Sequence, residues 1–563
     1  MLEFHQLNRQ PFGVRVADCN RRLRFSLTPE HVLSNSVPPT TRYFDGRTIF
    51  WADSYEYAEP MPQFVIAVDQ GTTSTRAVAY DNSGTPVAQS QRPHEQIFPH
   101  PGWVEHNPAE IWANTVVVLT EVESALHGNP SAGVPAAIGI TNQRETVVLW
   151  NRVTGQPIGN AIVWQDTRTQ DRIDELEQSL GSDAARDITG LPLATYFSAT
   201  KIAWLLDTHP EARAAAERGE ICAGTIDSWL VWNLTGGPNG GQHLTDVTNA
   251  SRTLLMDIRT LEWRDDLCTL FDVPPAALPQ IVSSIDDFGR VAAGLPCEGA
   301  PITAVLGDQQ AATFGQLALE PGECKTTYGT GNFLIVSTGT ELVRSSHGLI
   351  STVGYRWGHQ PVHYALEGSV AVTGSLFQWL RDGLGLFSTN DEGERLAGEV
   401  PDNGGVYIVP AFSGLFAPHW RADARGVITG LTRFVTKHHI IRAALESVAF
   451  QTADIIAAAE ADTGAPVEIM KVDGGMTVNR DLMQFQADLL DREVVCANRH
   501  ESTALGAAFA AGLGAGVWKS IEELRGLSAG DPERFSPSMT ETERNELLRH
   551  WRKALDRSLG WVD

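Results

Sequence analysis

Three apolar runs, each followed by a turn of small residues, place the strongest constraint on how this chain folds. The turns are Val68-Asp-Gln-Gly-Thr-Thr73, Thr327-Tyr-Gly-Thr-Gly-Asn332 and Val472-Asp-Gly-Gly-Met-Thr477. From Met61 onward, strand-like runs alternate with helical stretches, which favours an α/β fold. The first turn lies early in the chain and the other two in its second half. We therefore predict two α/β domains, residues 61–314 and 315–563, that contribute turns to a shared cleft.

Residues 1–60 differ in character from the rest of the chain. They mix isolated aromatic residues and arginines, show no sustained period, and contain Pro38, Pro39 and Pro60 as breakers. An accessory segment is one interpretation. We favour a poorly ordered extension upstream of a natural start at Met61.

Charge and cysteine usage exclude several functional classes. The 563 residues carry a formal net charge of −25, which argues against nucleic acid or an anionic membrane surface as the main partner. Six scattered cysteines form no CxxC pair and suit a reducing cytoplasm. No apolar run approaches the roughly 18 residues that cross a bilayer, and arginines interrupt any signal-like segment. We expect a cytoplasmic protein without membrane insertion.

The first turn has the composition of a phosphate-binding loop. Gly71 allows close approach of the backbone, and the hydroxyl groups of Thr72, Thr73 and Ser74 can donate to phosphate oxygens. Arg76 can offset phosphate charge, and Asp69 can hold Mg²⁺ directly or through water. A polar hairpin between two strands is the alternative for this segment.

The other two turns extend the same interpretation. The glycines on either side of Thr330 can bring backbone N–H groups against a second phosphate. Gly474 and Gly475 leave room for a flat ring, and Asn479 is near enough to hydrogen-bond adenine. Each segment alone could equally be an ordinary glycine turn.

Asp308 follows the apolar run from Ile302 to Leu306, so it should lie at the carboxyl end of a strand. Catalytic groups favour that position in α/β proteins, and a carboxylate there can accept a proton from a hydroxyl during phosphoryl transfer. Capping of the following helix is the alternative role for an aspartate here.

The polar stretch that follows another apolar run, Ala136 to Ile140, contains two adjacent residues of opposite charge, Arg144 and Glu145. A surface ion pair is the ordinary interpretation. The functional one is that Arg144 donates to neighbouring hydroxyl groups of a small polyol and Glu145 accepts from them. Trp164 and Phe333, which could also be core residues, would then cover the carbon side of the polyol.

Taken in order, these segments resemble the FGGY family of carbohydrate kinases, and most closely its members that phosphorylate glycerol. The resemblance is dense from about Val65 to Trp551. The stretches that carry it include VDQGTTSTRA (68–77), HPGWVEHNP (100–108), IGITNQRET (138–146), AIVWQDTRT (161–169), TDVTNASRT (245–253), GDQQAATFGQ (307–316), TYGTGNF (327–333), YALEG (364–368), VDGGMTVN (472–479) and ESTALGAA (501–508).

The resemblance implies two actin-like (ribonuclease-H-like) domains that flank an ATP cleft. It also implies the transfer of the γ-phosphoryl group of ATP to glycerol with Mg²⁺, giving sn-glycerol 3-phosphate and ADP, and a homo-oligomer (dimer or tetramer). Asp308 would be the general base and Asp69 would organise the metal. The implied acceptor site consists of Arg144, Glu145, Trp164, Tyr196, Asp308, Gln309 and Phe333. The implied nucleotide site consists of Thr72, Thr73, Ser74, Arg76, Thr330, Gly374, Gln378, Gly475 and Asn479.

Departures from the family pattern concern regulation. Residues 290–299 lack the glycine- and basic-rich loop of members inhibited by fructose 1,6-bisphosphate, and residues 283–303 contain no histidine for phosphocarrier-type activation. We predict that neither control operates. Two alternatives to glycerol phosphorylation stay open: a family kinase for another polyol or sugar, such as xylulose, and a non-catalytic actin-like nucleotide switch.

Overall fold

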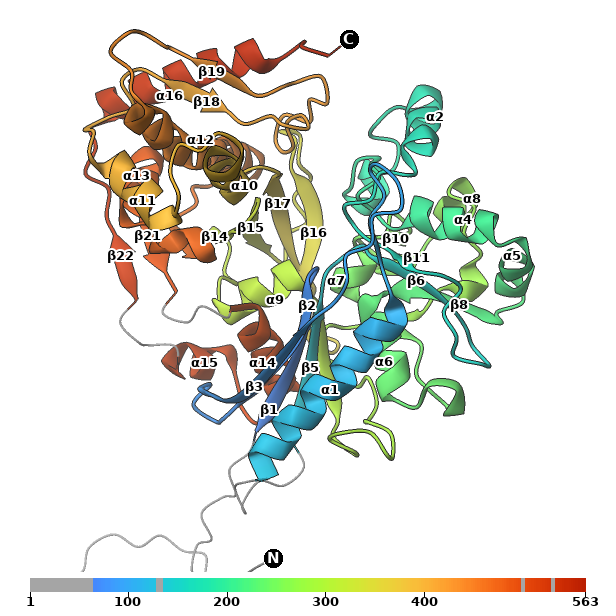
Figure 1. Ribbon diagram of the computed structural model, residues 1–563. Helices are drawn as coiled ribbons and strands as arrows, with labels where there is room; N and C mark the ends of the chain where they lie inside the picture. The colour runs from blue at the N-terminus through green and yellow to red at the C-terminus, as the bar shows by residue number, and fades with distance from the viewer. Residues whose placement is uncertain (1–63, 128–134, 498–501, 528–531, 563) are drawn as a thin grey trace, which may run out of the picture. The chain divides into compact units, whose positions relative to one another are not determined.

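The structure is a computed structural model that describes residues 64–127, 135–497, 502–527 and 532–562 (Figure 1). All of these belong to one compact unit. The extension predicted for residues 1–60 lies outside the described residues. In the described part of the chain, no helix has the length and apolar character needed to cross a membrane.

The first large sheet has five strands in the order β13-β5-β1-β2-β3. Neighbours β1, β5 and β13 are parallel, whereas β2 pairs antiparallel with β1 and β3. The strands are β1 (Val65–Gln70), β2 (Ser74–Tyr80), β3 (Pro86–Pro93), β5 (Ala137–Asn142) and β13 (Ile302–Gly307).

Both faces of this sheet are covered, so its central strands are apolar on both sides. Along β1, Ile66 and Val68 pack in the core that includes α1 (Pro108–His127). The alternate residues Val65 and Ala67 pack in a second core with α9 (Asp308–Gly315) and α14 (Ser502–Gly514). Successive side chains of a strand point to opposite faces, which explains the continuous apolar run in the sequence.

The second large sheet repeats the arrangement of the first, with the order β16-β17-β15-β14-β20-β21-β22. Its first strand, β14, pairs antiparallel with β15 and parallel with β20, as β1 does with β2 and β5. The two phosphate-loop-like turns therefore occupy equivalent places, after β1 and after β14. The strands are β14 (Glu323–Tyr328), β15 (Asn332–Gly339), β16 (Ile350–Tyr355), β17 (His363–Val370), β20 (Ile469–Asp473), β21 (Glu493–Cys496) and β22 (Glu533–Phe535).

Helix α14 joins the two halves of the chain. It lies in the predicted second domain, yet it packs on β1, β5 and β13 of the first sheet and on α9. Small residues permit this approach, since a Cβ atom added at Gly506 would overlap the carbonyl oxygen of Ala311. Helix α14 is therefore tightly packed against α9, which carries Asp308 at its first position, and holds it in place.

A third sheet, β4-β7-β6-β8, and its helices extend the first domain. The strands are β4 (Glu105–His106), β6 (Val147–Asn151), β7 (Ala161–Ile162) and β8 (Ile221–Thr225). Helices of this part include α2 (Gln170–Leu180), α3 (Arg186–Thr189), α4 (Ala199–Thr208), α5 (Pro210–Glu217), α6 (Ile226–Leu234), α7 (Val247–Ala250) and α8 (Asp265–Leu270). Those around the second sheet include α10 (Gly374–Gln378), α11 (Asn390–Gly398), α12 (Lys437–Thr463), α13 (Arg480–Leu490) and α16 (Glu541–Leu555). Helix α15 (Ile521–Leu527) packs with α14 in a core of the first sheet.

Candidate active site

The turn between β1 and β2 is fixed by hydrogen bonds to its backbone. The N–H of Gly71 donates to the carbonyl of Ser74 at 3.0 Å. Outside the turn, Gln96 Nε2 donates to the carbonyl oxygen of Thr72 at 2.8 Å, and His94 Nε2 lies 2.9 Å from the same oxygen. These contacts fix the loop shape without consuming the hydroxyl groups that the phosphate hypothesis requires.

Charged and aromatic side chains flank the same turn. Asp69 and Arg76, which face each other across the β1–β2 ladder, form an ion pair at 3.1 Å. Trp164, just after β7, donates its indole N–H to the hydroxyl of Thr72 at 3.0 Å. The predicted metal carboxylate and an acceptor-site aromatic residue therefore both adjoin the predicted phosphate loop.

The segment after β5 contains a strained turn. Glu145 has a φ of 60°, and the N–H of Thr146 donates to the carbonyl of Arg144 at 2.7 Å. Positive φ at a non-glycine residue in a three-residue turn is unfavourable and persists only where surrounding contacts enforce it. Arg144 and Glu145 are each about 2% exposed, so they are not the surface ion pair of the ordinary interpretation.

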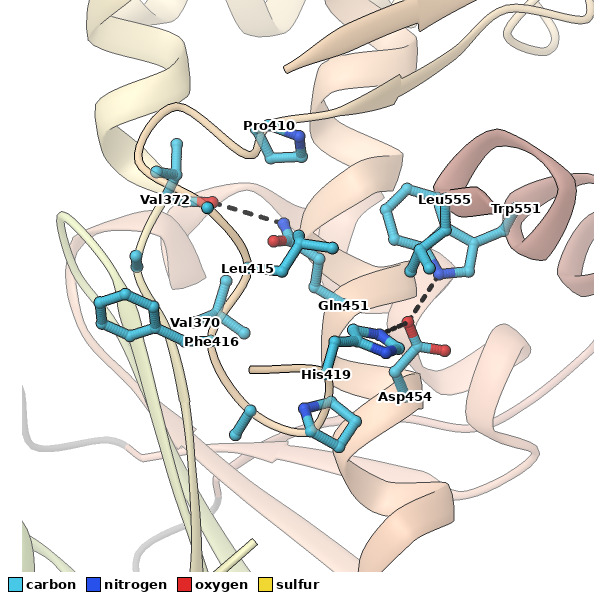
Figure 2. A pocket seen from close by; sticks show the side chains of 14 residues that line it. Val370, Val372, Pro410, Leu415, Phe416, His419, Gln451, Asp454, Trp551 and Leu555 are labelled. Carbon is cyan, nitrogen blue, oxygen red and sulfur yellow. Dashed lines mark hydrogen bonds and ion pairs between the residues drawn. The ribbon is translucent and has the colours of Figure 1, made fainter. Parts of the chain in front are cut away.

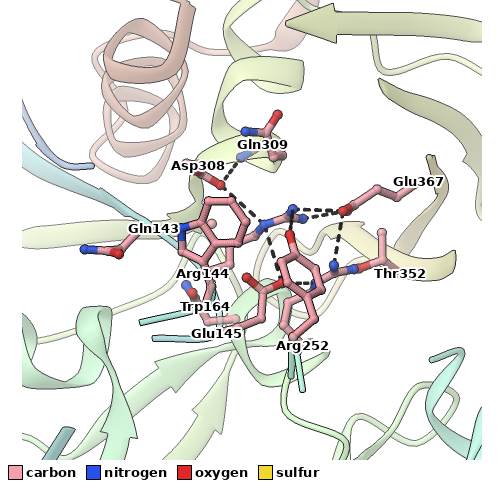
Figure 3. Close-up of polar contacts among 12 residues, drawn as sticks. Gln143, Arg144, Glu145, Trp164, Arg252, Asp308, Gln309, Thr352 and Glu367 are labelled. Carbon is pink, nitrogen blue, oxygen red and sulfur yellow. Dashed lines mark hydrogen bonds and ion pairs between the residues drawn. The ribbon is translucent and has the colours of Figure 1, made fainter. Parts of the chain in front are cut away.

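Arg144 is the centre of a buried polar network (Figure 3). Its Nη1 and Nη2 atoms donate to the two carboxylate oxygens of Glu367 at 2.6 and 2.9 Å. Longer contacts run from Nη1 to Gln310 Oε1 at 3.3 Å and from Nη2 to the hydroxyl of Tyr196 at 3.5 Å. On the opposite side from Glu367, the Nε atom lies 3.3 Å from Oδ1 of Asp308.

A second buried arginine shares the carboxylates of this network. Arg252 Nε donates to Glu145 Oε1 at 2.7 Å, and Arg252 Nη2 donates to Glu367 Oε1 at 3.1 Å. Burial alone would raise the pKa of Glu367, but Arg144 and Arg252 outweigh it and hold that pKa at about 2. The two guanidinium groups thus favour the carboxylate form of Glu367.

Asp308 lies directly after β13, where the sequence predicts it, and it is the first residue of α9. Gly307 occupies the cap position, and Asp308 Oδ1 accepts from the adjacent N–H of Gln309 at 2.7 Å, so the carboxylate also satisfies one free N–H of the first turn. Burial raises the pKa of Asp308, while the positive charges of Arg144 and Lys325 oppose the rise. Lys325 itself is fully buried and donates to Gln309 Oε1 at 2.7 Å.

The predicted aromatic residues form one wall beside this network. The Trp164 ring meets Tyr196 edge-on at a centroid separation of 5.6 Å and Phe333 at 6.1 Å. Tyr196 in turn contacts Arg144. All seven predicted acceptor residues are thus linked by a continuous chain of contacts, although they come from five separate segments of the chain.

The predicted nucleotide residues of the second domain surround one cavity of about 410 Å³, a size typical of small-ligand sites. The lining includes Thr330, Gly374, Gln378, Gly475 and Asn479, together with Tyr328, Gly329, Ser375, Phe377, Arg381, Asn390, Glu394, Leu445 and Met476. The residues of the β1–β2 turn are not in this lining. Two segments meet closely here, since a Cβ atom on Gly374 would lie 2.5 Å from the carbonyl oxygen of Gly329.

Two residues of the cavity, Gly475 and Asn479, could contact the adenine ring in different ways. A Cβ atom on Gly475 would meet no atom within 4 Å, so this residue borders open space in the cavity. Asn479 caps α13, because its Oδ1 accepts from the N–H of Leu482 at 2.9 Å. A contact from Asn479 to adenine would therefore come from its Nδ2.

A second, smaller pocket lies between the end of β17, α12 and α16 (Figure 2). Its volume of about 20 Å³ suits roughly one water molecule. Asp454 accepts from Trp551 Nε1 at 2.8 Å and pairs with His419 at 3.3 Å. These contacts join α16 to α12, and none of the sequence-predicted site residues lines the pocket.

Sequence reasoning missed three charged residues of the site: Arg252, Lys325 and Glu367. Two of them lie in stretches that carry the family resemblance, TDVTNASRT and YALEG, but those stretches by themselves indicate no role for them. Lys325 and Glu367 each interrupt a buried strand. For Glu367, a lone charge after the apolar residues of its strand is the signal that could have revealed it, since charged residues are almost never fully buried without a partner. The polar sequence of the Lys325 strand offers no such signal.

Comparisons with known proteins agree with this geometry. Residues 64–315 match the N-terminal domain of the FGGY family of carbohydrate kinases, and residues 324–515 match its C-terminal domain. The chain belongs to the FGGY family of carbohydrate kinases. Among curated FGGY relatives, the glycerol kinase of Pseudarthrobacter chlorophenolicus is 56% identical over 503 residues, 89% of this chain and 99% of that protein. The glycerol kinase of Methylorubrum populi is 56% identical over 507 residues, with the same coverage.

Solved structures support the same family. A crystal structure of Plasmodium falciparum glycerol kinase with ADP aligns with a TM-score of 0.84 and 39% identity, covering 88% of this chain and 98% of that one. Xylulose kinase from Lactobacillus acidophilus aligns with a TM-score of 0.78 at 22% identity, covering 88% and 97%, which bears on the fold alone. The predicted two-domain α/β fold of the FGGY kinases, with actin-like domains, is confirmed.

Proposed function

We propose that the protein is an ATP-dependent glycerol kinase that converts glycerol to sn-glycerol 3-phosphate with release of ADP. The observation that carries this proposal is the acceptor site. A carboxylate at a strand end, Asp308, adjoins a buried arginine and an aromatic wall, beside a phosphate-type turn. The high identity to glycerol kinases along nearly their whole length supports the same conclusion.

The acceptor residues suit a small polyol. Arg144 presents donors and Glu145 acceptors, while Trp164 and Phe333 offer apolar ring surface to carbon atoms. Of the contacts made by Arg144, those to Asp308 and Tyr196 are long, at 3.3 and 3.5 Å. Hydroxyl groups of glycerol would insert at these two places, where Arg144 meets the proposed base and the aromatic wall.

The proton of the reacting hydroxyl would pass to Asp308. A partly buried carboxylate with a raised pKa is a stronger base than an exposed aspartate, and positioned bases typically contribute about 10²- to 10⁴-fold to the rate. The oxygen of that hydroxyl would form a bond to the γ-phosphorus of ATP as the bond from the γ-phosphorus to ADP breaks. Arg76 and the N–H groups of the β1–β2 turn would stabilise the charge on the transferring group.

ATP would occupy the 410 Å³ cavity, with its base against Gly475, and its phosphates would extend to the glycine turns that follow β14 and β1. In the described ranges, no group of three or more His, Cys, Asp or Glu side chains is placed to hold a metal ion. Asp69 supplies one carboxylate beside the phosphate turn. That donor set fits Mg²⁺, which kinases commonly bind through one or two carboxylates, water and substrate phosphates. When bound, Mg²⁺ would neutralise phosphate charge.

The proposal is tested by an acceptor panel. The protein is incubated with ATP, Mg²⁺ and glycerol, dihydroxyacetone, xylulose, gluconate or no acceptor, and the phosphorylated product is identified by ³¹P NMR. Glycerol 3-phosphate as the main product is the expected result. Preference for a sugar would leave the family assignment intact but show that the substrate is not glycerol. ATP binding without turnover would favour a nucleotide switch.

We also propose a cytoplasmic location and a homo-oligomeric state.

A further inference from the structure

Glu367 makes the shortest contacts to Arg144, yet it belongs to the other domain. It lies on β17, in the second large sheet, opposite Ile335 of β15, and its side chain is fully buried. Its two oxygens accept from both Nη atoms of Arg144 at 2.6 and 2.9 Å. Such a two-point pair between a guanidinium and a carboxylate fixes orientation as well as position.

The charges around Arg144 show what this pair prevents. Three carboxylates approach Arg144: Glu367, Glu145 and Asp308. Glu145 lies 3.9 Å from Arg144 Nε and already accepts from Arg252 at 2.7 Å. If the charge of Glu367 were removed, the nearest carboxylate left for Arg144 would be Asp308, at 3.3 Å.

We propose that Glu367 is a positioning residue for the acceptor site, which keeps the guanidinium of Arg144 aligned for substrate and away from a close pair with Asp308. This inference rests on the proposed phosphoryl transfer to glycerol. Glu367 acts through Arg144 and touches neither substrate. Because Glu367 stands on the second sheet and Arg144 on the first domain, the acceptor site depends on side chains of both domains.

The test replaces Glu367 by glutamine, which keeps the shape and removes the charge. Without the carboxylate of Glu367, the guanidinium of Arg144 would move toward Asp308. A misplacement of about 1 Å at a reacting centre can reduce rates by about 100-fold. We expect kcat/KM for glycerol to fall by about 10- to 100-fold, while the KM for ATP stays within about twofold, because the nucleotide cavity is lined by other residues.

Glu446 provides a matched control. It is a buried glutamate of the same domain, on α12, that accepts from Arg442 Nε at 2.8 Å and from Asn403 Nδ2 at 2.8 Å. Glu446→Gln removes the same charge from a buried arginine pair outside the acceptor site. We expect lower thermal stability in this variant and an unchanged KM for glycerol.

A second variant, Glu367→Asp, keeps the charge but draws it back by one methylene. It should recover part of the kcat/KM that Glu367→Gln loses. If the glutamine variant does not fold, Glu367→Asp tests the inference in its place. An unchanged kcat/KM for glycerol in both Glu367 variants would overturn the inference. It would also be overturned if Glu367→Gln lowered kcat/KM for glycerol and for ATP equally, and if Glu446→Gln lowered both by the same amounts. Absence of glycerol turnover in the unaltered protein would instead count against the proposed function, so the two failures are distinguishable.

Discussion

Gly307→Ala adds a single methyl group, which would lie against Arg144 of the proposed acceptor site. Gly307 has φ −59° and ψ 150°, which alanine adopts without backbone strain. A Cβ atom there would lie 2.7 Å from both Cγ and Cδ of Arg144 and 2.9 Å from Oε1 of Gln310. Carbon atoms pack at about 3.5–4.0 Å, so the stem of Arg144 must move by roughly 1 Å.

Two effects of different size follow from that displacement. Overpacking of this kind costs about 1–3 kcal/mol of folding stability. A shift of about 1 Å in a substrate-binding group can lower kcat/KM by about 100-fold. We therefore expect Gly307→Ala to fold, with a modestly lower Tm, and to lose far more activity toward glycerol than its stability loss explains. The KM for ATP should change little.

The assay measures Tm by calorimetry and steady-state kinetics with glycerol and ATP varied separately. Gly526→Ala is the control, because a Cβ atom on this α15 residue meets no atom within 4 Å. It should change neither kinetic parameter. A folded Gly307→Ala protein with kcat/KM for glycerol within about twofold of the parent would refute the reasoning, since the expected loss is about 100-fold.

Three further predictions test other parts of the site. Gly475→Ala should leave the Tm of the ligand-free protein unchanged, because the added methyl group meets open space. In coupled-assay kinetics it should raise the KM for ATP about tenfold, which corresponds to about 1.4 kcal/mol. Lys325→Met removes a cation that lowers the pKa of Asp308, so the acid limb of the kcat/KM profile for glycerol should move to higher pH; a shift to lower pH would contradict this. Tyr196→Phe removes the hydroxyl that faces Arg144 and should raise the KM for glycerol by about 2- to 10-fold, as expected for one hydrogen bond of about 0.5–1.5 kcal/mol.

Local sequence pattern is sufficient to predict the strand ends of the site. An apolar run followed by small residues specifies a buried strand and a tight turn without information from elsewhere in the chain. Asp69, Asp308 and Thr330 can therefore be placed at such ends from the sequence alone. The family resemblance then supplies the acceptor residues that lie in less distinctive loops, such as Tyr196.

Contacts across the two domains could not be predicted in the same way. Glu367 approaches Arg144 only because β17 lies near the first domain in the folded chain, and the two residues are 223 positions apart. The same holds for α14, whose tight packing is visible in its small residues while its docking on the first sheet is not. Pairing of distant segments depends on the whole fold, whereas turns and strand ends depend on a few neighbouring residues.

The central claim is that Asp308 serves as the base for phosphoryl transfer to glycerol. The most direct measurement compares Mg²⁺-dependent ADP release by the parent protein and Asp308→Ala, with and without glycerol, alongside ATP binding by calorimetry. We predict rapid ADP release that requires glycerol in the parent, a loss of about 10²- to 10⁴-fold in the variant, and similar ATP affinity in both. Glycerol-dependent turnover by Asp308→Ala within about tenfold of the parent would contradict the account.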